Sequence, residues 1–427
     1  MVWRVCTKWR SVALPRVSAF RALRYDPDRI PLADVISPPY DVITEELQSE
    51  LYSRAMQNVV RVELGRRYSD DQDGVRDQYL RARDHLRVWQ EQGFMVRDPE
   101  PSLYIHRHSF PAPDGTGERT RLGCFAAVEP VPYDRGEVLR HELTLTSPRE
   151  DRLRLLLATG VQTSPILLLF EDGAEVMAAL QHQIAASPPV AEAMVEGERG
   201  GECHRLWRVR DPAAVAAIGQ LLGSTRLFIA DGHHRYETAL GLHLPGVLAL
   251  LAPLEDPATV ILPTHRVLLN SPLDPDELMT ALVGAGWRAQ RMDGIIPGLV
   301  GLTELREAWH SFVIFDSDTT WLVSRRRQAA SGPGTAAHLD VTVLNREILE
   351  AHLGVGADDL QAGRLRYTRD PAEAVRLVGE RGAVGFLLNP PSVAEVRAVS
   401  VAGAAMPQKS TYFFPKVPAG LVLLPNQ

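Results

Sequence analysis

A run of acidic, small and basic residues follows a short apolar segment, residues 227–230, near the middle of the chain. The run comprises Asp231, Gly232, His233, His234 and Arg235. A helix-forming stretch comes next, and the first N–H groups of a helix have no partner within it and carry partial positive charge. Gly232 lets a ligand approach the backbone, and Arg235 can donate two hydrogen bonds to a phosphate. The pattern predicts a phosphate site, with helix capping by Asp231 and solvated histidines as the alternative.

The composition of the chain is that of an ordinary globular protein. Its 427 residues are 45% hydrophobic and 23% charged, which is enough for two or three domains with apolar cores. The formal net charge is −7 and no basic patch stands out, which argues against nucleic-acid binding. No apolar run reaches the roughly 18 residues of a membrane span. The three cysteines lack disulfide or metal spacing, so we expect a cytoplasmic protein.

Lysine is almost absent, and two of the three lysines lie close together near the C-terminus. Among 46 basic residues only three are lysines, and Lys409 and Lys416 both fall within residues 406–416. A compact ammonium kept there indicates a place that a wider guanidinium would not fit, with chance as the alternative. We expect this segment to fold back onto the core and close the site. Lys409 is expected to face the bound phosphates or the molecule that accepts a phosphoryl group. Ser410 and Thr411 are expected to donate hydrogen bonds to the same anion.

Phosphoryl transfer also needs a group that orients or deprotonates the acceptor, and usually Mg²⁺. Asp41 follows two prolines, whose fixed φ angles predict a rigid turn over residues 36–43. Glu63 lies in residues 59–64, where apolar and charged residues alternate as in a strand. Both are candidates for the base or a metal ligand, with Asp41 preferred. Turn capping and a solvent-facing strand position are the respective alternatives.

Two further pairs of polar residues are candidates for substrate binding. His141 and Glu142 precede a threonine-rich segment and could bind the acceptor or a metal, or form an exposed pair on a loop. His265 and Arg266 follow a proline turn and could form a second anion contact or a structural ion pair.

The spacing of apolar residues predicts an α/β protein with a mixed sheet. We expect an extension over residues 1–16, a core with an inserted subdomain over 17–270, and a C-terminal α/β domain over 271–427 whose tail returns to the site. The expected strands are 17–25, 59–64, 103–110, 119–128, 164–170, 206–209, 227–230, 246–254, 258–262, 384–388 and 421–424. The expected helices include 74–92, 148–158, 173–186, 211–222 and 392–398, and a linker is expected at 327–338.

Seven blocks spread from about residue 17 to 424 resemble a bacterial and archaeal family known as domain of unknown function 1015. The blocks are residues 37–43, 139–142, 148–152, 164–166, 229–237, 263–266 and 409–416. The resemblance covers nearly the whole chain, and seven blocks in order are specific for the family.

The block at residues 231–235 also resembles the phosphate-binding motif of the ParB/sulfiredoxin superfamily. That superfamily includes archaeal free-serine kinases, which use ADP as donor. The resemblance implies a ParB/sulfiredoxin-like nucleotide-binding core, a nucleotide at this loop and a phosphotransfer reaction. In those small kinases the motif lies far nearer the N-terminus, so the resemblance also implies a large insertion here and leaves the acceptor open.

Other signatures of nucleotide or metal sites fail on inspection. Cys203, His204 and Arg205 are similar to a sulfiredoxin signature, but residues 206–209 predict a strand where a helix start is needed. A Walker A loop is excluded because no Gly-Lys pair occurs in the chain. No zinc-type His/Cys spacing appears.

The working hypothesis is therefore a nucleotide-dependent small-molecule kinase that uses ATP or ADP with Mg²⁺. Free serine or a related hydroxyl compound is the expected acceptor. Two alternatives stay open: a ParB-type nucleotide-binding switch without an acceptor, and a hydrolase that transfers phosphate to water. The acidic balance argues against a DNA clamp, and the sequence leaves the oligomeric state open.

Overall fold

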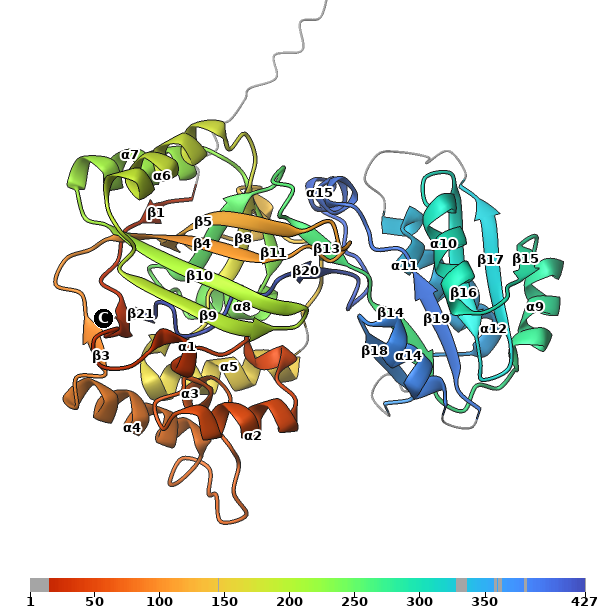
Figure 1. Cartoon of the computed structure of the whole chain (residues 1–427), viewed down its shortest axis with the longest axis horizontal. Helices are drawn as coiled ribbons and strands as arrows, with labels where there is room; N and C mark the ends of the chain where they lie inside the picture. Colours follow the sequence, from red (N-terminus) through yellow and green to blue (C-terminus); the bar gives the residue numbers. More distant parts are fainter. Residues whose placement is uncertain are drawn as a thin grey trace, which may run out of the picture. The chain divides into compact units, whose positions relative to one another are not determined.

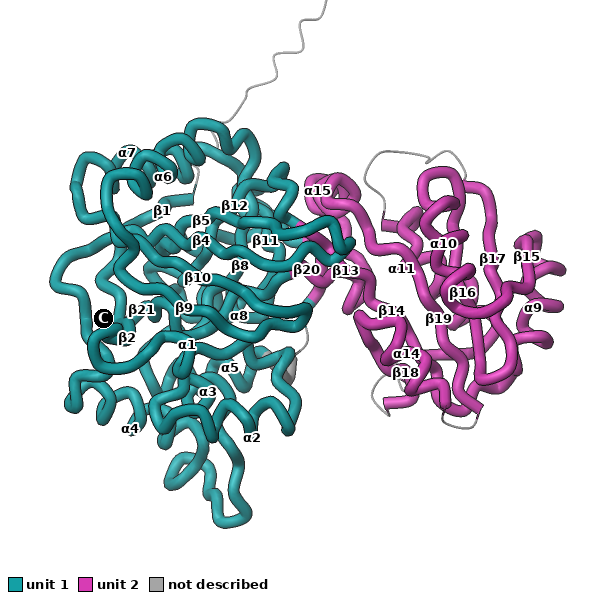
Figure 2. Tube along the Cα trace, in the orientation of Figure 1, with its two compact units in different colours: residues 1–140, 144–259, 415–427 teal, residues 141–143, 260–414 magenta. Residues whose placement is uncertain are grey.

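The computed structural model describes residues 15–144, 146–327, 336–356, 359, 363–379 and 382–426. Residues 1–14 of the expected extension at 1–16 and residues 328–335 of the expected linker at 327–338 lie outside the described residues, and the last three linker residues form η3 (Ala336–His338). The chain divides into two compact units, coloured separately in Figure 2. The first unit contains residues 1–140, 144–259 and 415–427, and the second contains 141–143 and 260–414. The division thus falls before residue 270, and the C-terminal segment belongs to the first unit.

The first unit is built on a nine-stranded mixed sheet. The strand order is β6-β11-β8-β12-β5-β4-β10-β9, with β1 paired to β5. Helices cover both faces: α6 and α7 lie on one side of the sheet, and α1 to α5 lie on the other (Figure 1). Its helices are α1 (Leu32–Val35), η1 (Tyr40–Val42), α2 (Glu45–Arg54), α3 (Val60–Glu63), α4 (Gln78–Glu91), η2 (Tyr133–Arg135), α5 (Thr146–Thr159), α6 (Ala174–Ala186), α7 (Pro212–Leu222) and α8 (His233–Gly241).

The strands of the first unit run mostly antiparallel to their neighbours, but β12 is parallel to β8 and β11 is parallel to β6. Two short ribbons, β2–β3 and β7–β21, stand apart from the large sheet. The strands are β1 (Val17–Ser18), β2 (Leu23–Tyr25), β3 (Met95–Arg97), β4 (Leu103–Pro111), β5 (Glu118–Val128), β6 (Val138–Leu139), β7 (Val161–Gln162), β8 (Ile166–Phe170), β9 (Ala191–Gly197), β10 (Gly200–Val209), β11 (Leu227–Asp231), β12 (Val247–Pro253) and β21 (Leu424–Pro425).

Both faces of the large sheet are buried, and they differ in chemistry. Leu103 and Ile105 of β4 join the main apolar core, in which α6 and α7 pack onto the sheet. Successive side chains of a strand point to opposite faces, so His106 and His108 lie on the other face. Both of these histidines are also buried. The second face of the sheet therefore carries buried polar groups, which need partners of their own.

The second unit contains a six-stranded antiparallel sheet in the order β15-β17-β16-β19-β14-β18, and a separate β13–β20 ribbon. Its strands are β13 (Val260–Leu262), β14 (His265–Leu268), β15 (Arg288–Arg291), β16 (Trp309–Phe315), β17 (Thr320–Arg326), β18 (Leu365–Thr368), β19 (Val384–Leu388) and β20 (Tyr412–Phe414). Its helical segments are α9 (Pro275–Gly284), α10 (Ile295–Leu305), η3 (Ala336–His338), α11 (Asp340–Val343), the π-helix η4 (Leu344–Glu350), α12 (Ala351–Leu353), α14 (Pro371–Val378) and α15 (Val393–Val401).

The prediction of a mixed α/β fold is confirmed, and one element is corrected. Residues 59–64, expected as a strand, contain the short helix α3. Asn58 explains the difference, because its side-chain Oδ1 accepts a hydrogen bond from the N–H of Val60 at 3.0 Å. This local contact favours a helical start over the alternating pattern. Within the described residues, no helix is both long and apolar enough to cross a bilayer.

Candidate functional site

The strand β11 passes into helix α8 through a glycine that no other residue could replace without strain. Gly232 is the N-cap of α8, with a φ of +93° and no side-chain cap. A Cβ at this position would lie 2.6 Å from Cγ2 of Ile166. The first hydrogen bond within the helix runs from the N–H of Tyr236 to the carbonyl of Gly232, at 3.0 Å. The strand, glycine and helix start predicted from the sequence are confirmed.

Asp231 binds two cations instead of capping the helix. One carboxylate oxygen accepts from Nη2 of Arg235 at 2.7 Å, and the other accepts from Nζ of Lys416. Burial alone would raise the pKa of Asp231, but Lys416 and then Arg235 hold that pKa well below its usual range. The carboxylate is therefore ionised and fixes both cations in place.

One nitrogen of the Arg235 guanidinium makes no hydrogen bond. Its Nη1 donates to the carbonyl of Pro165 at 2.6 Å, and Nη2 is taken by Asp231. Its Nε is buried and has no hydrogen-bond partner. Burial opposes the charge on Arg235, but Asp231 first, and then Tyr40, Asp41 and Glu63, outweigh it and raise the pKa of Arg235. The guanidinium is thus a fixed cation with a buried N–H that needs an acceptor.

A second arginine lies in the same part of the first unit. Glu63 is completely buried and accepts hydrogen bonds from Thr163 and from Oγ of Ser164, the latter at 2.8 Å. Its Oε1 lies 3.3 Å from Nη1 of Arg152, an ion pair in which Nη1 makes no hydrogen bond. Arg152 lies over the ring of Tyr40, with 3.9 Å from Cζ to the ring centroid. Burial raises the pKa of Tyr40 to about 12, so this phenol is neutral.

A small pocket joins the two arginines. It has a volume of about 40 Å³, which is room for a few water-sized atoms. Its polar lining comes from the side chains of Arg152, Gln162, Thr163, Ser164, Arg235 and Thr238. Asp41 is exposed, on η1 next to Tyr40, and acts electrostatically on Arg235. The predicted residues Asp41, Glu63 and 231–235 therefore fall in one neighbourhood of the first unit.

The other predicted site residues fall in the second unit, where several contact one another. Nε2 of His141 lies 2.9 Å from Oγ1 of Thr411. Oε1 of Glu142 accepts from the N–H of Ser410 and from Oγ1 of Thr411, each at 3.2 Å. Burial raises the pKa of Glu142. Ser410 and Thr411, expected to donate hydrogen bonds to an anion, thus contact Glu142 and His141. Lys409 itself is exposed, with a φ of +57°.

His265 and Arg266 are buried on β14. Burial lowers the pKa of His265 to about 4 and that of Arg266 to about 10. Nη1 of Arg266 donates to the carbonyl of Thr264, whereas Nε and Nη2 have no hydrogen-bond partner. Their assignment to substrate binding, like that of His141 and Glu142, stays a prediction.

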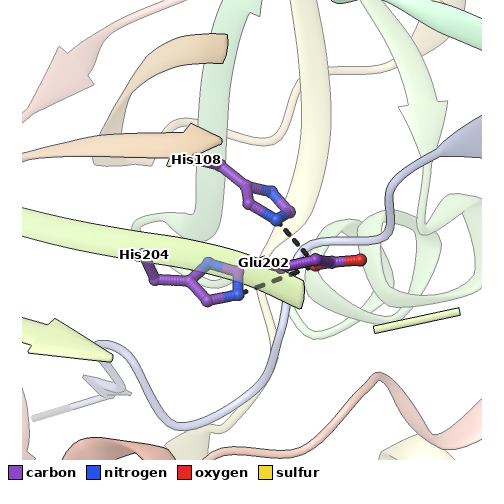
Figure 3. Close-up of side chains that lie close together, drawn as sticks. All are labelled: His108, Glu202 and His204. Carbon is purple, nitrogen blue, oxygen red and sulfur yellow. Dashed lines mark hydrogen bonds and ion pairs between the residues drawn. The ribbon is translucent and has the colours of Figure 1, made fainter. Parts of the chain in front are cut away.

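Sequence reasoning missed Lys416 as a partner of Asp231, and it missed Tyr40 and Arg152. The scarcity of lysine was a usable signal, but it was applied to Lys409. It also missed a cluster of His108, Glu202 and His204, whose ligand atoms all lie within 4.8 Å of one another (Figure 3). The signal was the two-residue spacing in β4 and β10, which puts alternate side chains on one face.

The Cys203 signature lacks the helix start that the sulfiredoxin signature needs. The strand predicted for residues 206–209 is confirmed as part of β10, so no helix begins there. Burial raises the pKa of Cys203, which lowers its thiolate fraction.

Several solved structures resemble this one at low identity. A conserved hypothetical protein from Pyrococcus furiosus is 14% identical, with a TM-score of 0.36 over 70% of this chain and 95% of that one. A free serine kinase in complex with AMP is 12% identical, with a TM-score of 0.36 over 70% and 92%. SbnI from Staphylococcus aureus is 13% identical, with a TM-score of 0.32 over 67% and 83%.

No curated protein matches the sequence. A family model described as a protein of unknown function does match, over residues 17–342. Because this match spans most of the sequence, the chain belongs to the DUF1015 family.

Proposed function

We propose that this protein is a nucleotide-dependent small-molecule kinase whose first unit binds the nucleotide's phosphates at the start of α8. The observation that carries the proposal is the fixed pair of cations, Arg235 and Lys416, held by Asp231 beside the glycine N-cap of that helix. A helix start with adjacent cations is a common way to bind phosphate.

Unused hydrogen-bond donors support a bound anion. Nε of Arg235 and Nη1 of Arg152 are both buried without a hydrogen-bond partner. Leaving such a donor unsatisfied costs about 1–3 kcal/mol, and more for a charged group. A phosphate oxygen would accept from both. The hydroxyl groups of Thr163 and Ser164 line the same pocket, but they already donate their protons to Glu63.

The geometry of Asp231 explains why its negative charge does not oppose the phosphate. With Arg235 and Lys416 it forms a group whose net charge is positive, so it aligns the cations without cancelling both. Lys416 supplies a compact point charge, and Arg235 supplies directional N–H groups. Mg²⁺ accompanies nucleoside phosphates and prefers oxygen ligands. The exposed carboxylate of Asp41, which interacts electrostatically with Arg235, would supply one such ligand.

The proposed reaction moves a phosphoryl group from the nucleotide to an alcohol. The acceptor's hydroxyl oxygen forms a bond to the terminal phosphorus while the bond from that phosphorus to the bridging oxygen breaks. The shortened nucleotide leaves with the bridging oxygen, and the hydroxyl proton passes to a carboxylate. Asp41 is the first candidate for this base because it is exposed. Glu63 is the second, since its oxygens already accept from Thr163 and Ser164.

The acceptor class, free serine or a related hydroxyl compound, is taken from the resemblance to the free-serine kinases. We assign the binding of a small carboxylate, within the second unit alone, to the cluster that contains His141, Glu142 and Arg266, with Ser410 and Thr411 as the residues that hold Glu142 in place. The two unpartnered N–H groups of Arg266 suit the carboxylate of an amino acid.

The test is a turnover assay of the full chain with labelled ATP, ADP or CTP, Mg²⁺ and a panel of hydroxyl metabolites that includes free serine. The proposal expects a phosphorylated product that appears only when an acceptor is present. Phosphate release without an acceptor would identify a hydrolase, and binding without turnover would identify a switch. Either result would refute the kinase proposal while leaving the phosphate site intact.

A further inference from the structure

His108, Glu202 and His204 form a compact group of metal-binding side chains outside the proposed phosphate site. Their side chains point toward one another in Figure 3. Nε2 of His108 lies 2.7 Å from Oε2 of Glu202, and Nε2 of His204 lies 3.8 Å from the same oxygen. One ligand atom from each residue can be chosen so that all three lie within 4.8 Å of one another. Bonds of about 2.0–2.2 Å to one zinc-sized ion would require Nε2 of His108 and Oε2 of Glu202 to move apart from their 2.7 Å contact.

The register of the sheet brings these residues together. On antiparallel strands β4 and β10, His108 is the direct partner of His204. Glu202 lies two residues from His204 on β10, so both side chains share one face. Gly197 of β9 leaves room for the carboxylate, because a Cβ there would lie 2.0 Å from Oε1 of Glu202. The backbone thus accommodates this arrangement specifically.

In one of the two tautomers of His204, the contact between His204 and Glu202 has no proton donor. Nδ1 of His204 lies 3.1 Å from Nε2 of His106, which orients the ring from behind. If Nδ1 of His204 donates this bond, Nε2 is an unprotonated nitrogen that faces the carboxylate of Glu202 at a distance too long for a hydrogen bond. Two electron-pair donors facing each other in a buried site favour a cation between them.

Burial favours the protonation states that a metal needs. It lowers the pKa of His108 and the pKa of His204 well below their usual range, so both rings are neutral near pH 7. Neutral imidazoles and a carboxylate are ligands for zinc and neighbouring first-row metals.

We propose that His108, Glu202 and His204 bind a divalent first-row transition metal, with Zn²⁺ as the representative ion. Nε2 of each histidine and Oε2 of Glu202 are the ligand atoms, and His106 is a positioning residue for His204. Three protein ligands leave a coordination position open for water or another small ligand. Glu202 is the most exposed of the three, at 7%, and marks the side from which the ion enters.

A contact with Arg121 supports the competing interpretation, in which His108 and Glu202 form a hydrogen-bonded pair without a metal. Arg121 is buried, and one of its nitrogens lies 3.4 Å from Nδ1 of His108. When Arg121 donates this bond, His108 carries its proton on Nε2 and donates to Glu202, and the pair needs no metal. Metal binding through Nε2 moves that proton and opens the contact with Arg121. The two interpretations therefore predict different behaviour toward added Zn²⁺.

The test measures metal binding directly, with no activity assay. The full chain is stripped with a chelator, titrated with Zn²⁺ against a chromophoric competitor, and analysed for metal content after dialysis. The proposal expects one equivalent of tightly bound Zn²⁺, and visible absorption bands of low-symmetry Co²⁺ when Co²⁺ replaces it. His108→Asn, Glu202→Gln and His204→Asn should each weaken Zn²⁺ binding by more than about 100-fold, and His106→Phe by about 10- to 100-fold.

The matched control is His182→Asn, because His182 is an exposed histidine of α6 in the same unit. This variant should bind Zn²⁺ as the unaltered chain does. Absence of an equivalent of bound Zn²⁺ in the unaltered chain would overturn the proposal and leave a hydrogen-bonded core cluster. Unchanged affinity in the three ligand variants would overturn it too. If a variant does not fold, the stoichiometry and Co²⁺ spectrum of the unaltered chain decide alone.

Discussion

The first unit contains two polar clusters, one around Asp231 and Glu63 and the other around Glu202. They differ in the kind of group that lacks a hydrogen-bond partner. Around Asp231 and Glu63, the groups without a hydrogen bond are donors: Nε of Arg235, and Nη1 of Arg152, which forms an ion pair with Glu63 at 3.3 Å. Around Glu202, an acceptor is in excess when Nδ1 of His204 carries the ring proton, because the carboxylate then faces the unprotonated Nε2 of His204. Surplus donors attract an anion and surplus acceptors attract a cation, so one sheet supports two kinds of site.

The two clusters are electrostatically connected through Arg121. Burial lowers the pKa of Arg121 to about 10, while Glu202, Asp256 and Asp231 act in the opposite direction. This arginine therefore interacts with carboxylates of both clusters. Variants of one cluster should nevertheless leave ligand binding at the other intact, and the predictions below are designed to show or refute that separation.

The largest effect is expected from the carboxylates of the phosphate cluster. Asp41→Asn should lower turnover by roughly 100- to 10,000-fold, because a general base or metal ligand is lost. Glu63→Gln should also lower turnover, because Glu63 pairs with Arg152. Zn²⁺ binding should be unchanged in both. Steady-state kinetics against Asp28→Asn, another exposed carboxylate of this unit, checks the prediction. Full turnover and unchanged Mg²⁺ dependence in both variants would remove these residues from the mechanism.

Variants of the two C-terminal lysines compare the role that the structure indicates for Lys416 with the role that the sequence predicts for Lys409. Lys416→Met removes a buried cation from Asp231 and should weaken nucleotide binding by about 10- to 100-fold. Lys409→Arg was expected from the sequence to lose most activity with little change in stability. Because Lys409 is exposed and Lys416 contacts Asp231, we expect the larger loss in nucleotide affinity for Lys416→Met. Equal nucleotide affinities for Lys416→Met and the unaltered chain would show that Lys416 does not contribute to nucleotide binding.

Gly232→Ala tests the backbone that forms the phosphate cluster. The substitution forces alanine into a left-handed conformation and brings its Cβ against Ile166, so a stability loss of about 2–4 kcal/mol is expected. Gly115→Ala is the matched control, because Gly115 also has a positive φ but no heavy atom within 4 Å of the added Cβ. Chemical denaturation compares the two. A smaller loss at Gly232 than at Gly115 would contradict the close approach to Ile166.

The histidine cluster should make stability depend on pH between about 7 and 5. Burial lowers the pKa of His106, His108 and His204 well below 6.5, so the unfolded chain binds protons that the folded chain does not. Stability without metal therefore decreases as pH falls below about 6.5, by up to about 1.4 kcal/mol per unit for each histidine. His106→Phe should flatten the slope, and His182→Asn should leave it unchanged. Calorimetric melting in chelator measures both, and equal slopes would contradict neutral burial of His106.

Sequence reasoning succeeded where the informative residues are contiguous. The strand, Gly232 and helix start were predicted correctly because local turn chemistry determines them. Most apolar strands and amphipathic helices were also predicted, since their periodicity is local. The strand predicted for residues 59–64 was wrong, because the local hydrogen bond from the N–H of Val60 to Asn58 favours a helix over the alternating pattern.

Contacts between segments far apart in the chain could not be predicted from the sequence. The pairing of Asp231 with Lys416 joins residues far apart in the chain, and so does the pairing of His108 with His204. Both depend on strand order and register, which a single sequence does not specify. The two-residue spacing of His106 and His108 was a local signal, but it indicates a site only once β10 is placed beside β4.

The most direct test of the central claim is calorimetric titration of the full chain with ATP and ADP, with and without the Arg235 side chain. Arg235→Ala removes a charge-assisted contact worth about 2–3 kcal/mol, so nucleotide affinity should fall by about 30- to 150-fold. Arg87→Ala, which removes an exposed arginine paired with Glu91 on α4, should leave affinity unchanged. Undiminished nucleotide affinity in a folded Arg235→Ala protein would contradict the phosphate site.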